Sequence, residues 1–109
     1  MQPEAAFVVN VTDEGVASRR PNGYIEAVTW TDLRAVLIET NDEGPIGPDV
    51  FWILVWRQGG CVIPQGATGE DALLIRLQAL PGFDNDALIA AMSSTANQRF
   101  LCWRPNSGP

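Results

Sequence analysis

The acidic side chains near the middle of the chain come closest, in type and spacing, to a site for chemistry. They are Glu39, Asp42, Glu43 and Asp49. Carboxylate oxygens are the ligands that hard divalent cations prefer, so these side chains could converge at one end of a hairpin and bind such an ion. They lack the Gly at the sixth loop position and the bidentate acid at the twelfth that an EF-hand requires. A solvated acidic loop is the simpler interpretation, and we expect no metal site.

The other carboxylates offer weaker chemistry. Asp84 and Asp86 begin like a calcium loop, but an apolar segment follows at once, which indicates a helix cap instead. A carboxylate pair could also carry out glycosidic or phosphoryl chemistry. None of the thirteen acids, however, lies inside an apolar run that would raise its pKa. An enzyme that combines clustered carboxylates with a divalent metal is therefore the third of our interpretations.

The residue types that are missing exclude most common enzyme mechanisms. The sequence has no His and no Lys, which removes Ser-His and Cys-His catalysis, imidazole ligands and catalytic lysines. Cys61 and Cys102 each lie in a short apolar run, where a free Cys usually behaves as a buried hydrophobic residue. A disulfide stays open as an alternative if their strands are neighbours. We expect no enzyme activity and no cofactor.

The net charge of −6 argues against nucleic acid as a partner, because phosphate backbones would be repelled overall. The N-terminal residues lack the basic and apolar regions of a signal peptide, and no apolar run approaches the roughly 18 residues that span a bilayer. We therefore expect a cytoplasmic protein with no membrane partner.

Residues 50–57 are predicted to form the central strand, because seven consecutive apolar residues begin at Val50. Its alternation places Trp52 and Leu54 on one face and Ile53 on the other, so both faces must be covered. The remaining strands are expected at residues 5–12, 16–20, 24–28, 34–40, 61–63 and 98–103, and Pro64 ends its strand or marks an edge position.

Leucines at helical spacing from Leu73 to Leu80 predict a short helix that ends at Pro81-Gly82. A second short helix is predicted at residues 85–92, before the last strand. Residues 68–71 have the form of a capping box, with Asp in place of the usual Glu. Strands grouped before helices favour an α+β fold: an antiparallel β-meander of about six strands, two short helices and a final strand, with one helical layer on a curved sheet. We expect a single domain over residues 1–109, with loose ends at 1–4 and 104–109.

One helical layer can cover only one face of the predicted sheet. The other face, which carries Phe51, Ile53 and Val55, must then be covered by sheet curvature, by a partner or by a second copy of the chain.

Five motifs resemble a family of small acidic bacterial proteins of unknown function, over residues from about 28 to 103. They are Asp42-Glu43-Gly44-Pro45, Asp49-Val50-Phe51-Trp52, Gly60-Cys61-Val62-Ile63-Pro64-Gln65, Leu80-Pro81-Gly82-Phe83-Asp84-Asn85 and Phe100-Leu101-Cys102-Trp103. More loosely, a β-meander followed by helices is similar to pleckstrin-homology-like and small immunity-protein architectures, which bacteria use as binding modules.

The acidic charge and the long loop at residues 41–49 favour a non-catalytic, bacterial protein-binding module, which the looser resemblance would make immunity-like. The candidate partner-binding residues are Asp42, Glu43, Ile46 and Asp49 in that loop, together with Trp30. The alternative is a structural homodimer that pairs through an apolar sheet face or an edge strand.

Overall fold

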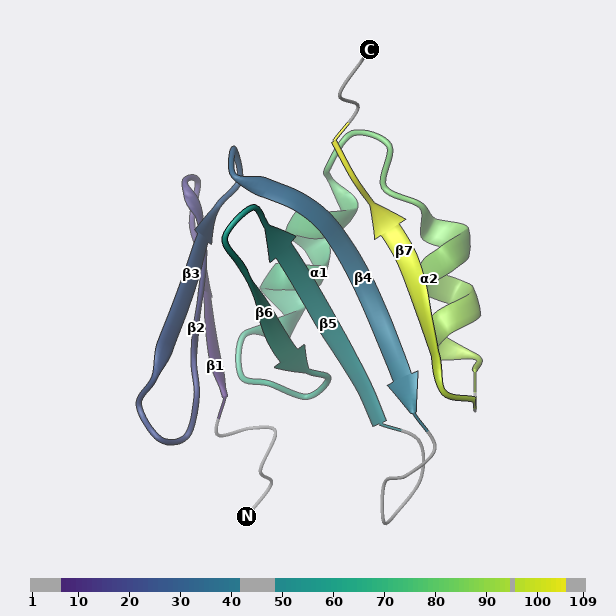
Figure 1. Cartoon of the computed structure of the whole chain (residues 1–109), viewed down its shortest axis with the longest axis horizontal. Helices are drawn as coiled ribbons and strands as arrows, with labels where there is room; N and C mark the ends of the chain where they lie inside the picture. Colours follow the sequence, from purple (N-terminus) through teal and green to yellow (C-terminus); the bar gives the residue numbers. More distant parts are fainter. Residues whose placement is uncertain (1–6, 42–48, 95, 106–109) are drawn as a thin grey trace.

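Figure 1 shows the computed structural model, which describes residues 7–41, 49–94 and 96–105. Every pairing between its strands is antiparallel, and the two helices follow the sixth strand. This confirms the expected α+β class. The elements in chain order are β1 (Val8–Val11), β2 (Gly15–Arg19), β3 (Ile25–Thr29), β4 (Leu33–Asn41), β5 (Asp49–Trp56), β6 (Gly59–Pro64), α1 (Glu70–Gln78), α2 (Asn85–Met92) and β7 (Gln98–Trp103).

The strands form two sheets, with the orders β1-β2-β3 and β6-β5-β4-β7. The chain leaves the first sheet through a turn in which the Asp32 amide donates to the Thr29 carbonyl at 3.1 Å. β4 then pairs with β5 on one side and with β7 on the other. Because both edges of β4 are occupied, β3 has no edge of β4 to join, and the predicted meander divides into two sheets.

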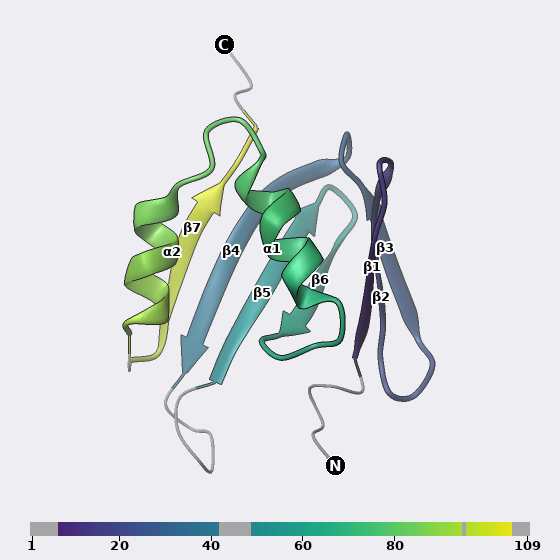
Figure 2. The same ribbon diagram turned by 180° about the vertical axis from the view of Figure 1, so that it is seen from behind.

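Both helices lie on the same side of the four-stranded sheet (Figures 1 and 2). Between them and the sheet is the hydrophobic core, in which Trp52 of β5 is 1% exposed. The other core side chains of this layer come from all four strands and both helices: Val36, Ile38, Leu54, Ile63, Cys102, Leu73, Leu77, Leu88 and Ala91. In the described part of the chain, no helix is long and apolar enough to cross a membrane.

The predicted alternation along β5 is confirmed. Trp52 and Leu54 are buried beneath the helices, whereas Phe51, Ile53 and Val55 are only partly buried. The second group points to the side of the sheet on which no helix lies (Figure 1).

The starts of the two helices differ from each other. Asp84 caps α2 as predicted, since its carboxylate accepts from the Ala87 amide at 3.0 Å. The predicted capping box of α1 is wrong, because the N-cap is Gly69 with φ of 92° and no side-chain cap. The backbone of Thr68 instead pairs with β1: its carbonyl accepts from the Val9 amide at 2.8 Å, and its amide donates to the Phe7 carbonyl at 2.9 Å. These bonds attach the first sheet to the start of α1.

Candidate functional site

The predicted loop site falls mostly on residues that the structure does not describe. Asp42, Glu43 and Ile46 lie outside the described residues, and Asp49 is placed only by its backbone, which pairs with Asn41 at the start of β5. The expectation that the loop contacts a partner therefore stays a prediction.

Trp30 precedes the start of β4, whereas the loop follows the end of β4. The nine residues of β4 separate these ends by about 27 Å at 3.3 Å per residue. The indole Nε1 of Trp30 donates to the Thr12 carbonyl at 2.9 Å. The Arg76 guanidinium lies over the ring of Trp30, 4.3 Å from its centroid. The structure thus places Trp30 where it joins the first sheet to α1, at the other end of β4 from Asn41, the last residue described at the start of the loop.

Glu39, the fourth acid of the predicted metal site, pairs with Arg99 at 2.7 Å, between β4 and β7. Within residues 7–41, 49–94 and 96–105, no group of three or more Cys, Asp or Glu side chains is arranged to hold a metal ion. A metal site that includes Asp42 and Glu43 would lie outside the described residues.

A row of four aliphatic side chains crosses the four-stranded sheet on the side away from the helices. The strand register places Val62 opposite Ile53, Ile53 opposite Leu37, and Leu37 opposite Leu101. Directly opposed residues project to the same face of a sheet, so the row is continuous. Val62 is 41% exposed and Leu101 is 46% exposed. We call this surface the open face; its other apolar members are Phe51, Val55 and Ala35.

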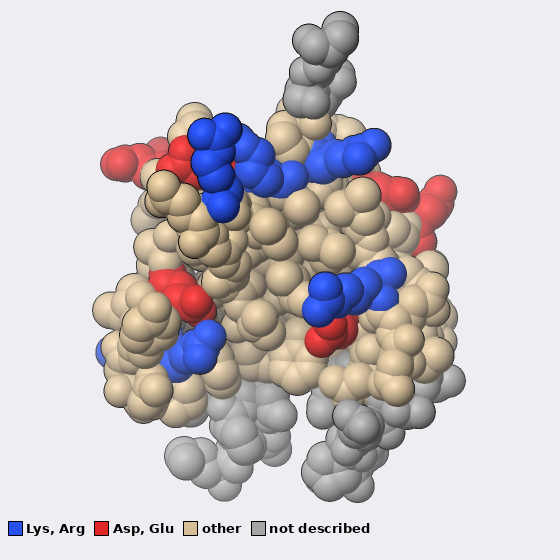
Figure 3. Space-filling view, in the orientation of Figure 1, with Lys and Arg blue, Asp and Glu red and all other residues tan. Residues whose placement is uncertain are grey.

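Figure 3 views the open face directly, as an uncharged central area with charged groups around it. Arg34 lies at the start of β4, whereas Arg57 follows the end of β5 and Arg104 the end of β7. Because these strands are antiparallel neighbours, the three arginines lie along the same edge of the sheet, the one at which β4 begins and at which β5 and β7 end. Blue side chains follow the upper margin in Figure 3. Asp32 also lies there, in one groove with Arg34 and Arg57. These four side chains together carry a net positive charge, although the whole chain is acidic.

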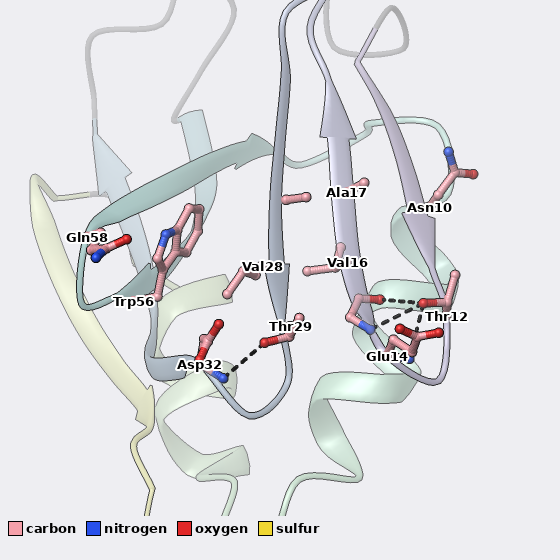
Figure 4. Close-up of a pocket in the computed structure, with 12 residues that line it drawn as sticks. Asn10, Thr12, Glu14, Val16, Ala17, Val28, Thr29, Asp32, Trp56 and Gln58 are labelled. Carbon is pink, nitrogen blue, oxygen red and sulfur yellow. Dashed lines mark hydrogen bonds between the residues drawn. The ribbon is translucent and has the colours of Figure 1, made fainter.

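Another groove lies between the first sheet and the β5–β6 turn, with a volume of about 470 Å³. Figure 4 shows Trp56 and Gln58 on one side of it, and Thr12 and Glu14 on the other. The Thr12 hydroxyl already accepts from the Glu14 amide at 3.2 Å. The ionisable side chains among its lining residues are Glu14 and Asp32, both of which are exposed. The lining residues that the structure describes include no thiol.

The two cysteines are buried free thiols, as predicted. Cys61 lies on β6 and Cys102 on β7, which are the opposite edges of the sheet. Three strand spacings, about 14 Å, separate these edges, so a disulfide cannot form. Burial raises the pKa of each thiol from 9.0 to about 11, with a smaller contribution from Glu26 for Cys61 and from Asp84 for Cys102.

We predict that neither thiol reacts at pH 8 with a disulfide reagent until the protein unfolds, since the reactive thiolate is suppressed in the folded state. The folded-state pKa is the higher one, so the unfolded chain loses its thiol protons first as the pH rises. The ionisation of these thiols should therefore leave the free energy of unfolding unchanged below about pH 9. It should lower the free energy of unfolding between pH 9 and 11. Denaturant midpoints at pH 8 and 10.5 measure this effect.

The Cys61→Ala/Cys102→Ala variant is the control, and its midpoint should fall less between the two pH values. Rapid labelling of the folded protein at pH 8, or the same pH-dependent fall in both proteins, would contradict the prediction.

Comparison with known proteins gave no match to a family model, to a curated protein or to a solved structure. The resemblance to a family of small acidic bacterial proteins therefore stays a prediction. The open face is the feature that sequence reasoning identified only in part: alternation indicated Phe51, Ile53 and Val55, but the contributions of Val62 and Leu101 depend on which strands pair.

Proposed function

We propose that this protein is a non-catalytic binding module that holds a protein partner against its open face. The observation that supports this most directly is the row Val62–Ile53–Leu37–Leu101, which is exposed at both ends and partly buried in the middle. Both helices cover the other side of the sheet. Soluble monomers rarely expose continuous apolar patches larger than a few hundred Å² without a functional reason.

The charges around the face define the chemistry of the partner. Arg34, Arg57 and Arg104 border one edge, and within the face Arg99 is neutralised by Glu39. A partner with an apolar centre and acidic residues on one side would complement this arrangement. If the loop at residues 41–49 contributes, it does so from the opposite edge, where β4 ends and β5 begins.

The size of the open face favours a partner segment over a second copy of the chain. Four strands spaced by about 4.8 Å, with three rows of side chains about 6.8 Å apart, present roughly 400 Å². A standard stable interface buries about 800 Å² on each partner. A homodimer, the second candidate, would need further surface from the first sheet or an edge strand, whereas one helix or strand of a partner would fit the face. An immunity-like role would involve such a partner. This role is supported by the sequence resemblance alone.

The test introduces a charge at the two most exposed positions of the row, Val62→Asp and Leu101→Asp, in affinity capture from host cells. Burying an unpaired carboxylate against an apolar partner costs several kcal/mol, so recovery of the partner should fall by more than about tenfold. Ile75→Asp is the matched control, because Ile75 is 70% exposed on α1, on the other side of the molecule. It should leave recovery unchanged.

Circular dichroism confirms that the variants fold, and light scattering reports the oligomeric state. A partner that both face variants retain in full would overturn the proposal. A concentration-dependent dimer of the native protein, abolished by Leu101→Asp, would identify the homodimer as the correct function instead.

A further inference from the structure

A second apolar groove lies on the opposite side of the molecule, between α1 and α2, with a volume of about 440 Å³. Figure 2 views this side. Its apolar walls come from Leu74 of α1 and from Leu88, Ile89 and Met92 of α2. Ile89 is 63% exposed and Met92 is 41% exposed. Two large apolar side chains of α2 are thus exposed to solvent beside the groove.

One end of this groove is acidic and rigidly built. The Glu70 carboxylate accepts from the indole Nε1 of Trp52 at 2.9 Å and from the Gly66 amide at 3.0 Å. Because Trp52 is fixed in the core, Glu70 is held at the mouth of the groove. Asp71 also lines the groove and is exposed. No arginine is among the lining residues, and Arg76 of α1 lies over the ring of Trp30 instead.

We propose that the groove between α1 and α2 binds an amphipathic helix of a partner protein that carries a Lys or Arg at one end. Apolar side chains one turn apart on that helix would contact Leu74, Ile89 and Met92, and its cation would pair with Glu70 and Asp71. Helix-in-groove recognition uses apolar anchors at i, i+3, i+4 and i+7 of the bound helix. The commitment to a basic helix comes from the two carboxylates, which have no arginine beside them among the lining residues and would repel an acidic segment.

This site is independent of the open face. The two surfaces lie on opposite sides of the four-stranded sheet and differ in charge, since arginines border the open face and carboxylates border the groove. One molecule could therefore hold two different partners at once, and loss of one site would leave the other intact.

The test uses fluorescence anisotropy of the full chain with three labelled model peptides of about four helical turns. The first carries Leu at i, i+3, i+4 and i+7 with Lys at one end. The second has Glu in place of Lys, and the third is a scrambled version of the first, with the same composition and no apolar face. Only the first should bind, with an affinity that falls as the salt concentration rises.

Glu70→Gln/Asp71→Asn should weaken binding of the Lys peptide by about tenfold, as should Ile89→Asp. Glutamine keeps an oxygen that can accept from Trp52, so the fold should survive. Val62→Asp, on the open face, should not change binding, which separates failure of this site from failure of the open face.

The proposal is overturned if the Lys peptide fails to bind, if the scrambled peptide binds equally well, or if the carboxylate variant has no effect. A different outcome is that the native protein alone forms polymers that the Glu70→Gln substitution prevents. In that case the groove binds the arginines of a second copy of the chain, and the proposal of a partner helix is also overturned.

Discussion

Replacing Gly69 by alanine is expected to destabilise the protein by about 3 kcal/mol, for two reasons that add. The backbone of Gly69 has φ of 92°, a left-handed conformation that costs an L-residue roughly 1–2 kcal/mol. An added Cβ would also lie 2.2 Å from the Val9 carbonyl oxygen. Because that oxygen belongs to the backbone of β1, the strand would have to move, and with it the bonds between β1 and Thr68.

Gly82→Ala is the matched control. Gly82 has φ of 81°, but a Cβ there would meet nothing within 4 Å. Its cost should be the conformational part alone, about 1 kcal/mol. Thermal unfolding followed by circular dichroism should therefore show a Tm fall of more than about 10 °C for Gly69→Ala and of about 5 °C for Gly82→Ala. Equal falls would mean that the close approach of β1 to the start of α1 does not occur.

Trp52→Ala should be the most destabilising substitution in the core, at about 4 kcal/mol. The indole is 1% exposed and lies between the sheet and the helices, so truncation leaves a cavity that neighbouring side chains cannot fill. The substitution also removes one of the two hydrogen-bond donors that hold the Glu70 carboxylate. Urea denaturation provides the free energy of unfolding.

Trp56 supplies a control of the same residue type on the same strand. Its side chain is only partly buried and lines the groove shown in Figure 4, so Trp56→Ala should cost about half as much. Trp52→Phe keeps most of the packing and should cost about 2 kcal/mol, through the lost indole volume and N–H group. A cost for Trp52→Ala no larger than that for Trp56→Ala would contradict the placement of Trp52 in the core.

These substitutions also bear on function, because Trp52 and Gly69 support the acidic groove and not the open face. Trp52→Phe should weaken binding of the basic helix by leaving Glu70 less constrained, while the open face should keep its partner. Measuring binding at both surfaces of the same variant therefore separates a general loss of stability from a specific loss of binding in the groove.

The sequence by itself determined the local features of this protein. Alternation with period two follows from strand geometry, so residues 50–56 alone predicted which side chains of β5 share a face. The cap at Asp84 was predictable for the same reason, since it bonds to an amide three residues away. The absence of His and Lys means that the chain carries no imidazole and no side-chain amine, whatever its fold.

Only the tertiary structure decided which of these local faces remain exposed. Strand pairing depends on hydrogen bonds between residues far apart in the chain, and no local pattern indicates that β7 lies beside β4. That pairing places Leu101 next to Leu37 and completes the open face. It also puts Cys61 and Cys102 on opposite edges of the sheet. The bond between Trp52 and Glu70 is likewise non-local, because it requires α1 to pack over β5. Both proposed surfaces therefore arise from contacts that periodicity and spacing do not encode.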